Sequence, residues 1–424
     1  MKHPNGRPGL TMTIVLQSLD ELSSYLGEAD SIYLSGCSAE IATLEHNDGL
    51  RSRKREASLS GIFIPGINTT DYSACSDLLR FQTFFMTPEF QPGLVRGNVD
   101  YLPWRYRDIL SFYQRKAVDV AVVMLSKPDS EGVCSYGTCA DFSPIALPRA
   151  RIKIGVINKK MPYTLGCGGI SLNDLDVVVN IDQPLNSLDR AQPDRQAVAI
   201  AKLLGSYVED NATLQMGLGK IPAAVAEELL DRRNLKVLSG LLDESVLKLE
   251  KAGALHPDLP AVGGVALGSE EFYRCLASNP RFSMQPVSVT HNLAKIVRTP
   301  SFIAINGALE VDVLGQVNSS VTARGYLAGP GGLPEFVSGA LRSKGGRSIV
   351  VISAATPNGA KSKIVHQLTG AMPSVGTVDA DIVITEHGAA ELRGKTLPQR
   401  IRAMIGIAAP EHREALERQV EITG

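Results

Sequence analysis

Several features that would assign this chain of 424 residues to a common class are missing. No apolar run approaches the roughly 20 residues that a membrane-spanning helix needs. The first residues, Met1–Leu10, have no apolar stretch of the kind found in secretory signals, so we expect none here. The formal net charge is −1, and the densest basic cluster, Arg51–Arg55, is short and typical of a solvated loop. Nucleic acid and membrane surfaces are therefore not expected partners.

The spacing of cysteines and histidines matches no common disulfide or metal-binding motif. None of the six cysteines forms a Cys-x-x-Cys pair, and no His-Glu-x-x-His occurs among the seven histidines. We therefore expect free thiols, a reducing cytoplasm and no metal site. The cysteines are Cys37, Cys75, Cys134, Cys139, Cys167 and Cys275.

What the sequence does contain is a series of short runs rich in valine and isoleucine. Near-continuous apolar strands are typical of parallel sheets covered on both faces, and helical patterns fall between them, so the fold class is α/β. The length favours two domains. A polar stretch with two prolines, Gln183–Asp194, separates them, which gives predicted domains at 1–190 and 191–424. The runs are 31–35, 118–125, 152–157, 175–181, 302–305, 348–352 and 382–384.

The last predicted helix begins near Pro398. Apolar residues from Ile401 to Ala408 fall at the i, i+3, i+4 and i+7 positions of one face. Proline cannot continue a helix, so Pro410 is expected to end or kink it.

Glycines follow an apolar strand in the segment Thr213–Val225. Gly217 and Gly219 precede Pro222, where a helix should begin, and exposed N–H groups there could hold an anion or an oxyanion. A tight strand–helix turn needs glycine in any case, so the pattern alone leaves both interpretations open. It is not a P-loop, because Lys220 is followed by Ile221, and a third dinucleotide-type glycine is missing.

Other segments are also candidates for a site. Gly329, Gly331 and Gly332 crowd one stretch, which indicates unusual backbone dihedrals, contact with a ligand or a flexible loop. Basic loops at 341–347 and 357–363 could meet phosphates or be solvated. Finally, 381–395 is an apolar strand that ends in charge and glycine, as site-forming strands of open α/β sheets do. Its candidate site-lining residues are Glu386, His387 and Gly388, and His387 is the one histidine within a candidate site.

Together these segments resemble the acetyl-CoA hydrolase/transferase family of the class I CoA-transferase group, including 4-hydroxybutyrate CoA-transferase. The resemblance covers nearly the whole chain in the right order. It rests on these segments: 99–103, 119–123, 213–222, 305–318, 331–340, 385–395 and 407–413.

This resemblance implies two CoA-transferase-like domains, each an open, mainly parallel sheet with flanking helices, and a site between them. It also implies transfer of CoA from an acyl-CoA to a carboxylic acid. A glutamate attacks the thioester to form an anhydride, CoA then attacks the glutamyl group, and the acid is exchanged. The residues that carry over to CoA or oxyanion binding are Gly217, Leu218, Gly219, Lys220, Ile221, Gly331 and Gly332. A homo-oligomer, as a dimer, is implied too, with no NAD, flavin or metal.

The chain departs from the family where the nucleophile belongs. Family members carry a His-Ser-Glu-Met type segment, whereas this chain has Leu238 for the histidine and Gly240 for the glutamate. Glycine has no side chain that can attack a thioester. Another glutamate could serve, with Glu40 the first candidate and Glu244, on a following helix, the second. Alternatively, water or another acceptor attacks directly, as in a hydrolase or acyltransferase, or the protein binds acyl-CoA without catalysis.

Overall fold

The computed structural model describes residues 13–188, 192–322, 325–370 and 372–423. They fall into two compact units, each made of three separate stretches of the chain. Unit 1 is Met1–Leu102, Ile109–Leu188 and Tyr273–Pro286, and unit 2 is Pro103–Asp108, Asp189–Phe272 and Val287–Gly424. Division of the chain at residue 190 stays a prediction. Within the described residues, no helix combines the length and apolar character needed to cross a membrane.

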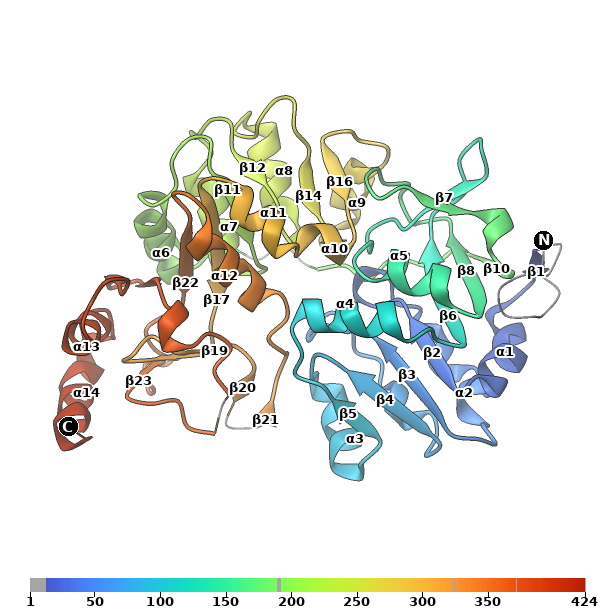
Figure 1. The fold of residues 1–424 in the computed structure, drawn as a ribbon, viewed down its shortest axis with the longest axis horizontal. Coiled ribbons are helices and arrows are strands. Elements are labelled where there is room, and N and C mark those ends of the chain that lie inside the picture. Colours follow the sequence, from blue (N-terminus) through green and yellow to red (C-terminus); the bar gives the residue numbers. More distant parts are fainter. Residues whose placement is uncertain (1–12, 189–191, 323–324, 371, 424) are drawn as a thin grey trace. The chain divides into compact units, whose positions relative to one another are not determined.

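Unit 1 is built on an eight-stranded sheet in which all the paired strands are parallel, in the order β1-β10-β8-β6-β2-β3-β4-β5 (Figure 1). All six residues of β6 are buried, as expected for a strand covered on both faces. The strands are β1 (Ile14–Leu16), β2 (Ser31–Leu34), β3 (Ala57–Gly61), β4 (Leu79–Thr83), β5 (Val99–Tyr101), β6 (Val120–Leu125), β8 (Ile152–Asn158) and β10 (Val177–Ile181), with a separate pair β7 (Val133–Ser135) and β9 (Gly169–Ser171) and the later β16 (Phe282–Met284).

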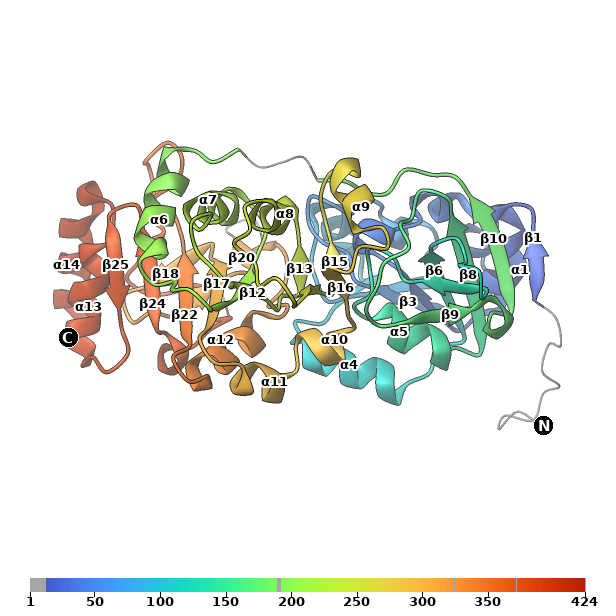
Figure 2. The same ribbon diagram turned by 90° about the horizontal axis from the view of Figure 1, so that it is seen from above.

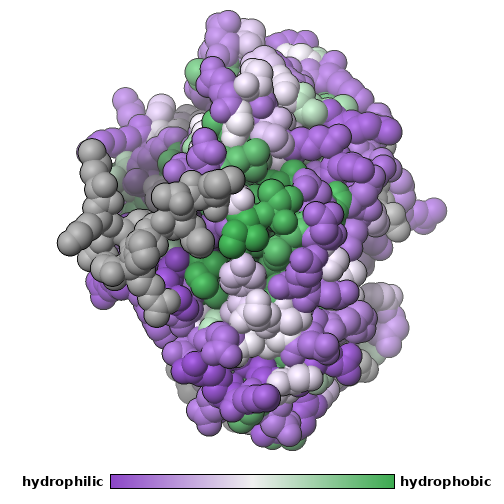
Figure 3. Space-filling model, turned by 90° about the vertical axis from the view of Figure 1, so that its right-hand side faces the viewer, coloured by the Kyte–Doolittle hydropathy of each residue, from purple (hydrophilic) through white to green (hydrophobic). Residues whose placement is uncertain are grey.

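Short helices connect these strands. The α-helices are α1 (Ser23–Glu28), α2 (Asp48–Arg51), α3 (Gln91–Arg96), α5 (Ser143–Ala146), and α4 (Tyr106–Arg115) and α9 (Glu270–Leu276), which each cross a unit boundary. The 3₁₀ helices are η1 (Leu19–Leu22), η2 (Cys37–Ala39), η3 (Ala42–His46), η4 (Tyr72–Ala74), η5 (Pro88–Phe90), η6 (Leu147–Arg149) and η7 (Leu172–Asp174). On the outer edge strand β1, Val15 is 57% exposed. Figure 3 shows apolar side chains gathered on one face within a largely hydrophilic surround.

Unit 2 has a six-stranded sheet in the order β12-β11-β17-β22-β24-β25, parallel except for the hairpin partner β25. Figure 2 shows α7 and α8 on one side of this sheet and α11 and α12 on the other. The strands are β11 (Thr213–Met216), β12 (Lys236–Val237), β17 (Phe302–Gly307), β22 (Arg347–Val351), β24 (Ile382–Thr385) and β25 (Gly388–Glu391). The smaller strands are β13 (Leu241–Leu242), β14 (Ala261–Gly263), β15 (Val265–Ala266), β18 (Glu310–Asp312), β19 (Val317–Asn318), β20 (Val321–Thr322), β21 (Gly325–Tyr326) and β23 (Ile364–Val365).

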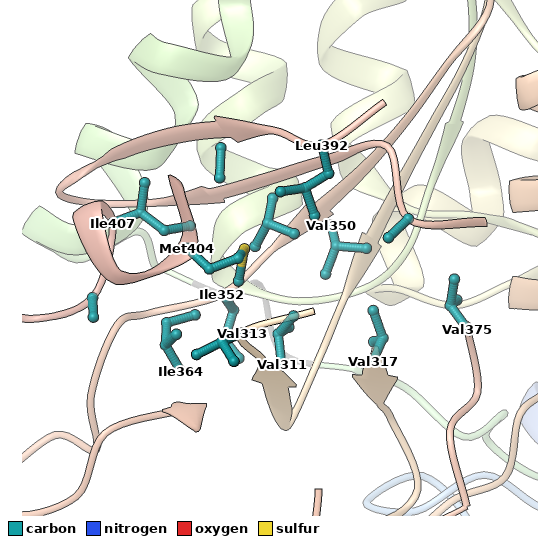
Figure 4. Packing of buried hydrophobic residues seen from close by; sticks show 14 of the residues in the cluster. Val311, Val313, Val317, Val350, Ile352, Ile364, Val375, Leu392, Met404 and Ile407 are labelled. Atoms are coloured by element: carbon teal, nitrogen blue, oxygen red, sulfur yellow. The ribbon is translucent and has the colours of Figure 1, made fainter. Parts of the chain in front are cut away.

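The helices of unit 2 follow these strands. They are α6 (Arg195–Gly205), α7 (Lys220–Glu228), α8 (Glu244–Lys251), α10 (Val287–Thr290), α11 (Leu293–Arg298), α12 (Leu333–Arg342), α13 (Leu397–Gly406) and α14 (Pro410–Thr423), with the 3₁₀ helix η8 (Thr377–Asp379). A large apolar cluster, to which the sheet, the β18–β19 hairpin and α13 contribute, fills one side of the unit (Figure 4). Its side chains include Val311, Val350, Leu392 and Met404.

The α/β class is confirmed, and every apolar run named from the sequence contains a strand. The prediction for the end of the chain is wrong in one respect. Helix α13 ends at Gly406, before Pro410, and Pro410 begins the further helix α14. The first position of a helix tolerates proline because its N–H has no partner within the helix.

Candidate functional site

The turn between β11 and α7 has the backbone that the sequence pattern suggests. Gly217, Leu218 and Gly219 make the turn, and α7 begins at Lys220. Gly219 has φ 117° and ψ −169°, a conformation essentially restricted to glycine. A Cβ on Gly217 or Gly219 would meet no atom within 4 Å. The turn therefore leaves an open approach to the N-terminus of a nine-residue helix, where N–H groups and the helix dipole favour an anion.

Lys220 and Ile221, which follow this turn, are the first two residues of α7. The Lys220 ammonium lies 3.2 Å from the carboxylate of Asp194, and both side chains are at least half exposed. This pairing leaves Lys220 accessible at the mouth of the turn. Ile221 occupies the second helical position and is partly buried.

Gly240 lies beside this turn. It follows β12, and the hydroxyl of the preceding Ser239 donates to the carbonyl oxygen of Met216, the last residue of β11, at 3.0 Å. The Gly240 carbonyl accepts from the backbone N–H groups of Gly264 and Val265 at 3.1 and 3.0 Å. These bonds fix the backbone at the position where the family carries its nucleophile.

The imidazole of His291 occupies the space in front of Gly240. A Cβ built on Gly240 would lie 2.9 Å from Cε1 and 3.0 Å from Nε2 of His291. A Cβ on Gly332 would lie only 2.2 Å from the same Nε2. Both glycines are therefore needed for the ring to sit where it does, and the ring joins Gly240 to the glycine segment that contains Gly332.

Aromatic and polar neighbours hold this imidazole. The ring of Tyr106 stacks on it with centroids 4.4 Å apart and planes 1° apart, and Phe336 packs at 4.6 Å. Nδ1 lies 2.9 Å from the Thr290 hydroxyl oxygen. Burial lowers the pKa of His291 to about 3, so the ring is neutral at physiological pH.

The second glycine segment supplies the start of α12. Gly331 has φ 54° and forms a bridge with Arg105, and Gly332 is the residue before the first turn of the ten-residue helix. In that first turn, Glu335 is 4% exposed, and neither of its carboxylate oxygens has a hydrogen-bond partner within the described residues. Burial raises the pKa of Glu335 to about 7. The backbone N–H groups of Glu335 and Arg107 favour its charged form without reaching hydrogen-bond geometry.

We call this arrangement in unit 2 the Gly240 site, comprising the Gly217–Gly219 turn, Gly240, His291, Gly332 and the flanking rings of Tyr106 and Phe336. Sequence reasoning missed His291, Tyr106 and Glu335. Glu335 carried a signal, because it lies in the glycine-rich family segment at the first turn of a predicted helix. His291 carried none, since only folding brings it to glycines that lie about 50 and 40 residues away in the sequence.

The residues at the end of β24 form a different environment. Glu386 and His387 are the two loop residues of the β24–β25 hairpin, and Gly388 begins β25. The carboxylate of Glu386 accepts from Gln196 and from the backbone N–H of Ala354, both at 2.9 Å. Glu386 thus ties α6 to the segment after β22. β24 is the third strand from β11 in the sheet, and a site-lining role for these residues stays a prediction.

Glu40 lies in unit 1, just after the turn that follows β2. It is 7% exposed, and one carboxylate oxygen accepts from Asn68 and Asn186 at 2.8 and 2.9 Å. The other oxygen has no partner within the described residues. Burial raises the pKa of Glu40, although the two amide donors oppose the shift.

The second substitute, Glu244, is engaged elsewhere. It is the first residue of α8, as expected, and its carboxylate accepts from the backbone N–H of Ser269 at 2.5 Å. The two basic loops are also separated, because 341–347 precedes β22 and 357–363 follows it. They lie at opposite ends of that strand and cannot hold one phosphate together.

Folding also gathers thiols that the sequence kept apart. The ligand atoms of Cys37, Cys139 and Asp141 lie within 4.8 Å of one another, and all three residues are buried. The hydrogen bond between the two thiols lowers the pKa of Cys37 but raises that of Cys139, and burial raises both, so both lie above the ordinary value. Two thiols and a carboxylate are possible metal ligands, and the described residues bring these three together although the sequence spacing did not reveal them.

Comparisons with known proteins agree with this fold and identify the family of the chain. Residues 268–420 match the family model of the acetyl-CoA hydrolase/transferase C-terminal domain. The 4-hydroxybutyrate coenzyme A transferase of Clostridium kluyveri is 36% identical over 330 residues, which cover 76% of this chain and 77% of that protein. The chain belongs to the acetyl-CoA hydrolase/transferase family.

Solved structures resemble the whole chain. The 4-hydroxybutyrate CoA-transferase from Porphyromonas gingivalis superposes with a TM-score of 0.78 at 26% identity, covering 97% of this chain and 98% of that one. RipA from Yersinia pestis gives a TM-score of 0.88 at 24% identity, covering 97% of each chain. The CoA-transferase fold of the chain is thereby established.

Proposed function

We propose that this protein acts on acyl-CoA thioesters and moves CoA from an acyl-CoA to a carboxylic acid. Family membership supports the substrate class, because its members are named as CoA transferases or hydrolases. The thioester and a small carboxylic acid are the partners of this reaction. The reaction calls for no metal, nicotinamide or flavin.

The observation that carries the proposal is the backbone at Gly219. Its φ of 117° and the empty space on its Cβ side leave the N-terminus of α7 open beside the position of the family nucleophile. N–H groups aimed at one point can bind a phosphate or stabilise the oxyanion formed when a thioester is attacked. Glycine adopts this conformation without steric cost, so the turn can present these N–H groups to a CoA thioester without strain.

A covalent route needs a glutamate other than residue 240. Glu40 and Glu335 are both buried carboxyl groups with a raised pKa, and each has at least one oxygen without a partner among the described residues. In this route the carboxylate attacks the thioester and expels CoA thiolate, leaving an acyl-glutamyl anhydride. The thiolate then attacks the glutamyl carbonyl and releases the first acid, and the second acid removes the CoA in the reverse sequence.

A direct route is the second candidate, and the position of His291 against Gly240 favours it. The ring occupies the space that the Cβ of any side chain at residue 240 would need, so residue 240 cannot carry a nucleophilic side chain while the ring is there. The acid, or water, then attacks the thioester carbonyl itself and CoA thiolate leaves. With an acid as the attacker, the mixed anhydride is opened by the same thiolate at its other carbonyl. With water, the reaction ends as hydrolysis.

The experiment is the intact mass of the protein after incubation with acetyl-CoA or butyryl-CoA, with borohydride added in a parallel sample. The covalent route predicts a CoA-sized adduct that borohydride reduces and that Glu40→Gln or Glu335→Gln abolishes. Unmodified protein that still exchanges or releases CoA selects the direct route. Absence of both adduct and CoA turnover with a panel of acyl-CoAs and acids would refute the proposed function.

A dimeric assembly and a cytoplasmic location complete the proposal. The dimer rests on the family resemblance, and the location rests on the six cysteines, none of which forms a disulfide in the structure. Light scattering coupled to size-exclusion chromatography tests the dimer, which predicts a mass of twice 45.4 kDa. The acyl group and the acceptor remain to be assigned by the substrate panel.

A further inference from the structure

One ring nitrogen of His291, Nε2, lies beside both Gly240 and Gly332. The residue is 8% exposed, and within the described residues Nε2 has no hydrogen-bond partner. Nε2 is also not fully shielded and keeps some contact with solvent. Water can therefore reach this atom at the N-terminus of α12, and a ligand that binds there can take the place of that water.

The charge state of the ring restricts the chemical class of ligand that Nε2 can bind. The shift in its pKa comes from burial, and the side chains of Thr290, Tyr106 and Phe336 that contact the ring carry no charge. The ten-residue helix α12 begins directly after Gly332 and directs its positive end toward the ring. A neutral imidazole in this setting is a weak base, but it is a good hydrogen-bond donor to a polarised carbonyl.

The position of the ring proton is part of the inference, because the Thr290 hydroxyl can either donate to Nδ1 or accept from it. Neutral imidazole carries one proton, on one nitrogen. If the Thr290 hydroxyl donates to Nδ1 across their 2.9 Å separation, the ring proton lies on Nε2 and faces Gly240 and Gly332. Nε2–H then supplies the donor at the position where the family nucleophile is missing.

We propose that His291, through Nε2–H, is a catalytic residue that donates a hydrogen bond to the carbonyl oxygen of the acyl thioester. This inference rests on the proposed function for the identity of the carbonyl compound. As the nucleophile adds to the carbonyl carbon, the C=O electron pair moves to oxygen, and the oxyanion accepts the Nε2–H bond. The pair then returns, the C–S bond breaks and CoA thiolate leaves, while His291 keeps its proton throughout.

Hydrogen-bond donation by His291 can be distinguished by experiment from a purely structural role of its ring. A structural ring could be replaced by any side chain of similar volume, whereas a donor requires N–H. His291→Gln retains an N–H donor and His291→Leu does not, although both remove the imidazole. His412→Gln, far along the chain on α14, is the matched control for loss of a histidine whose Nε2 lies 2.9 Å from the Gly359 carbonyl oxygen.

The binding test uses acetonyl-CoA, a ketone analogue that cannot be cleaved, labelled with ¹³C at its carbonyl. We expect the C=O stretch of the bound analogue to fall in the wild type and in His412→Gln, to fall partly in His291→Gln and to be unshifted in His291→Leu. In parallel, ¹⁵N spectra of the wild type should show a neutral ring protonated at Nε2 from pH 5 to 8. Protonation at Nδ1, or an equal carbonyl shift in His291→Leu, would overturn the proposal.

The kinetic test separates this inference from the proposed function. With an acyl-CoA that turns over, we expect His291→Leu to lower kcat by about 10²–10³ with little change in KM, and His291→Gln to recover at least about tenfold of that loss. Wild-type turnover with unchanged kcat in His291→Leu refutes the inference alone. A carbonyl shift without any turnover refutes the proposed function alone, and failure of the wild type to bind the analogue refutes both. Should His291→Leu fail to fold, the ¹⁵N spectrum and His291→Gln still decide.

Discussion

Nε2 of His291 lies against the backbone of Gly240 at a place where any side chain on residue 240 would begin. A Cβ there would come within 2.9 Å of Cε1 and 3.0 Å of Nε2. The family glutamate is therefore absent from residue 240, and the imidazole of His291 also fills the space that its Cβ would need. Restoring a carboxylate at 240 would require the imidazole to move.

The first prediction concerns the stability of this contact. Gly240→Ala should destabilise the protein by about 1–3 kcal/mol, because the new methyl group overlaps a ring that Tyr106 and Phe336 hold in place. Gly217→Ala is the control, since its Cβ would meet no atom within 4 Å and should change stability by less than about 1 kcal/mol. Urea unfolding of both variants gives the comparison, and equal effects would show that the ring yields without cost.

The second prediction concerns the conformation of Gly219. Gly219→Ala should cost about 1–3 kcal/mol of stability, because φ of 117° is strained for any L side chain even though the space is open. A turn that relaxes to relieve this strain also loses its anion-binding geometry, so we expect CoA affinity to fall. Unfolding curves and calorimetric titration with CoA measure the two effects. Unchanged affinity in a destabilised variant would separate this turn from CoA binding.

The third prediction follows from the buried carboxyl group of Glu335. Its pKa rises from 4.5 to about 7 on folding, so the unfolded state releases its proton first and stability is lost as pH rises from 4.5 to 7. Glu335→Gln should therefore stabilise the protein at pH 8 by about 2–3 kcal/mol relative to its effect at pH 4.5. Urea unfolding at the two pH values tests this, with the exposed Glu417→Gln as control. A gain that is the same at both pH values would show that Glu335 is charged in the folded protein.

The fourth prediction concerns acid sensitivity. The pKa of His291 falls from 6.5 to about 3 on folding, so the unfolded state binds the proton first and stability is lost as pH falls from 6.5 toward 3. The stability difference between wild type and His291→Gln should be constant above pH 7 and should change by about 2 kcal/mol in favour of the variant on going to pH 5. Unfolding curves across this range measure it. A difference that does not vary with pH would place a charged imidazole in the folded protein.

Local sequence was enough to predict much of the fold. A strand such as β6 is apolar along its whole length because both faces of the sheet are covered, and such runs can be read one segment at a time. Gly219 was equally readable, because glycine between a strand and a helix marks a conformation that other residues avoid. Pro410 was misread, since the same residue can stop one helix or start another, and only the packing of α14 decides between them.

The sequence by itself determined that this chain has an α/β fold with glycine turns at strand ends and that residue 240 has no side chain to act as a nucleophile. Those properties depend on residue type and on near neighbours in the chain. Only the tertiary structure decided what fills the position of the missing glutamate. His291 reaches Gly240 and Gly332 because β12, α10 and α12 pack together, and the desolvation that keeps its ring neutral exists only once that packing has formed.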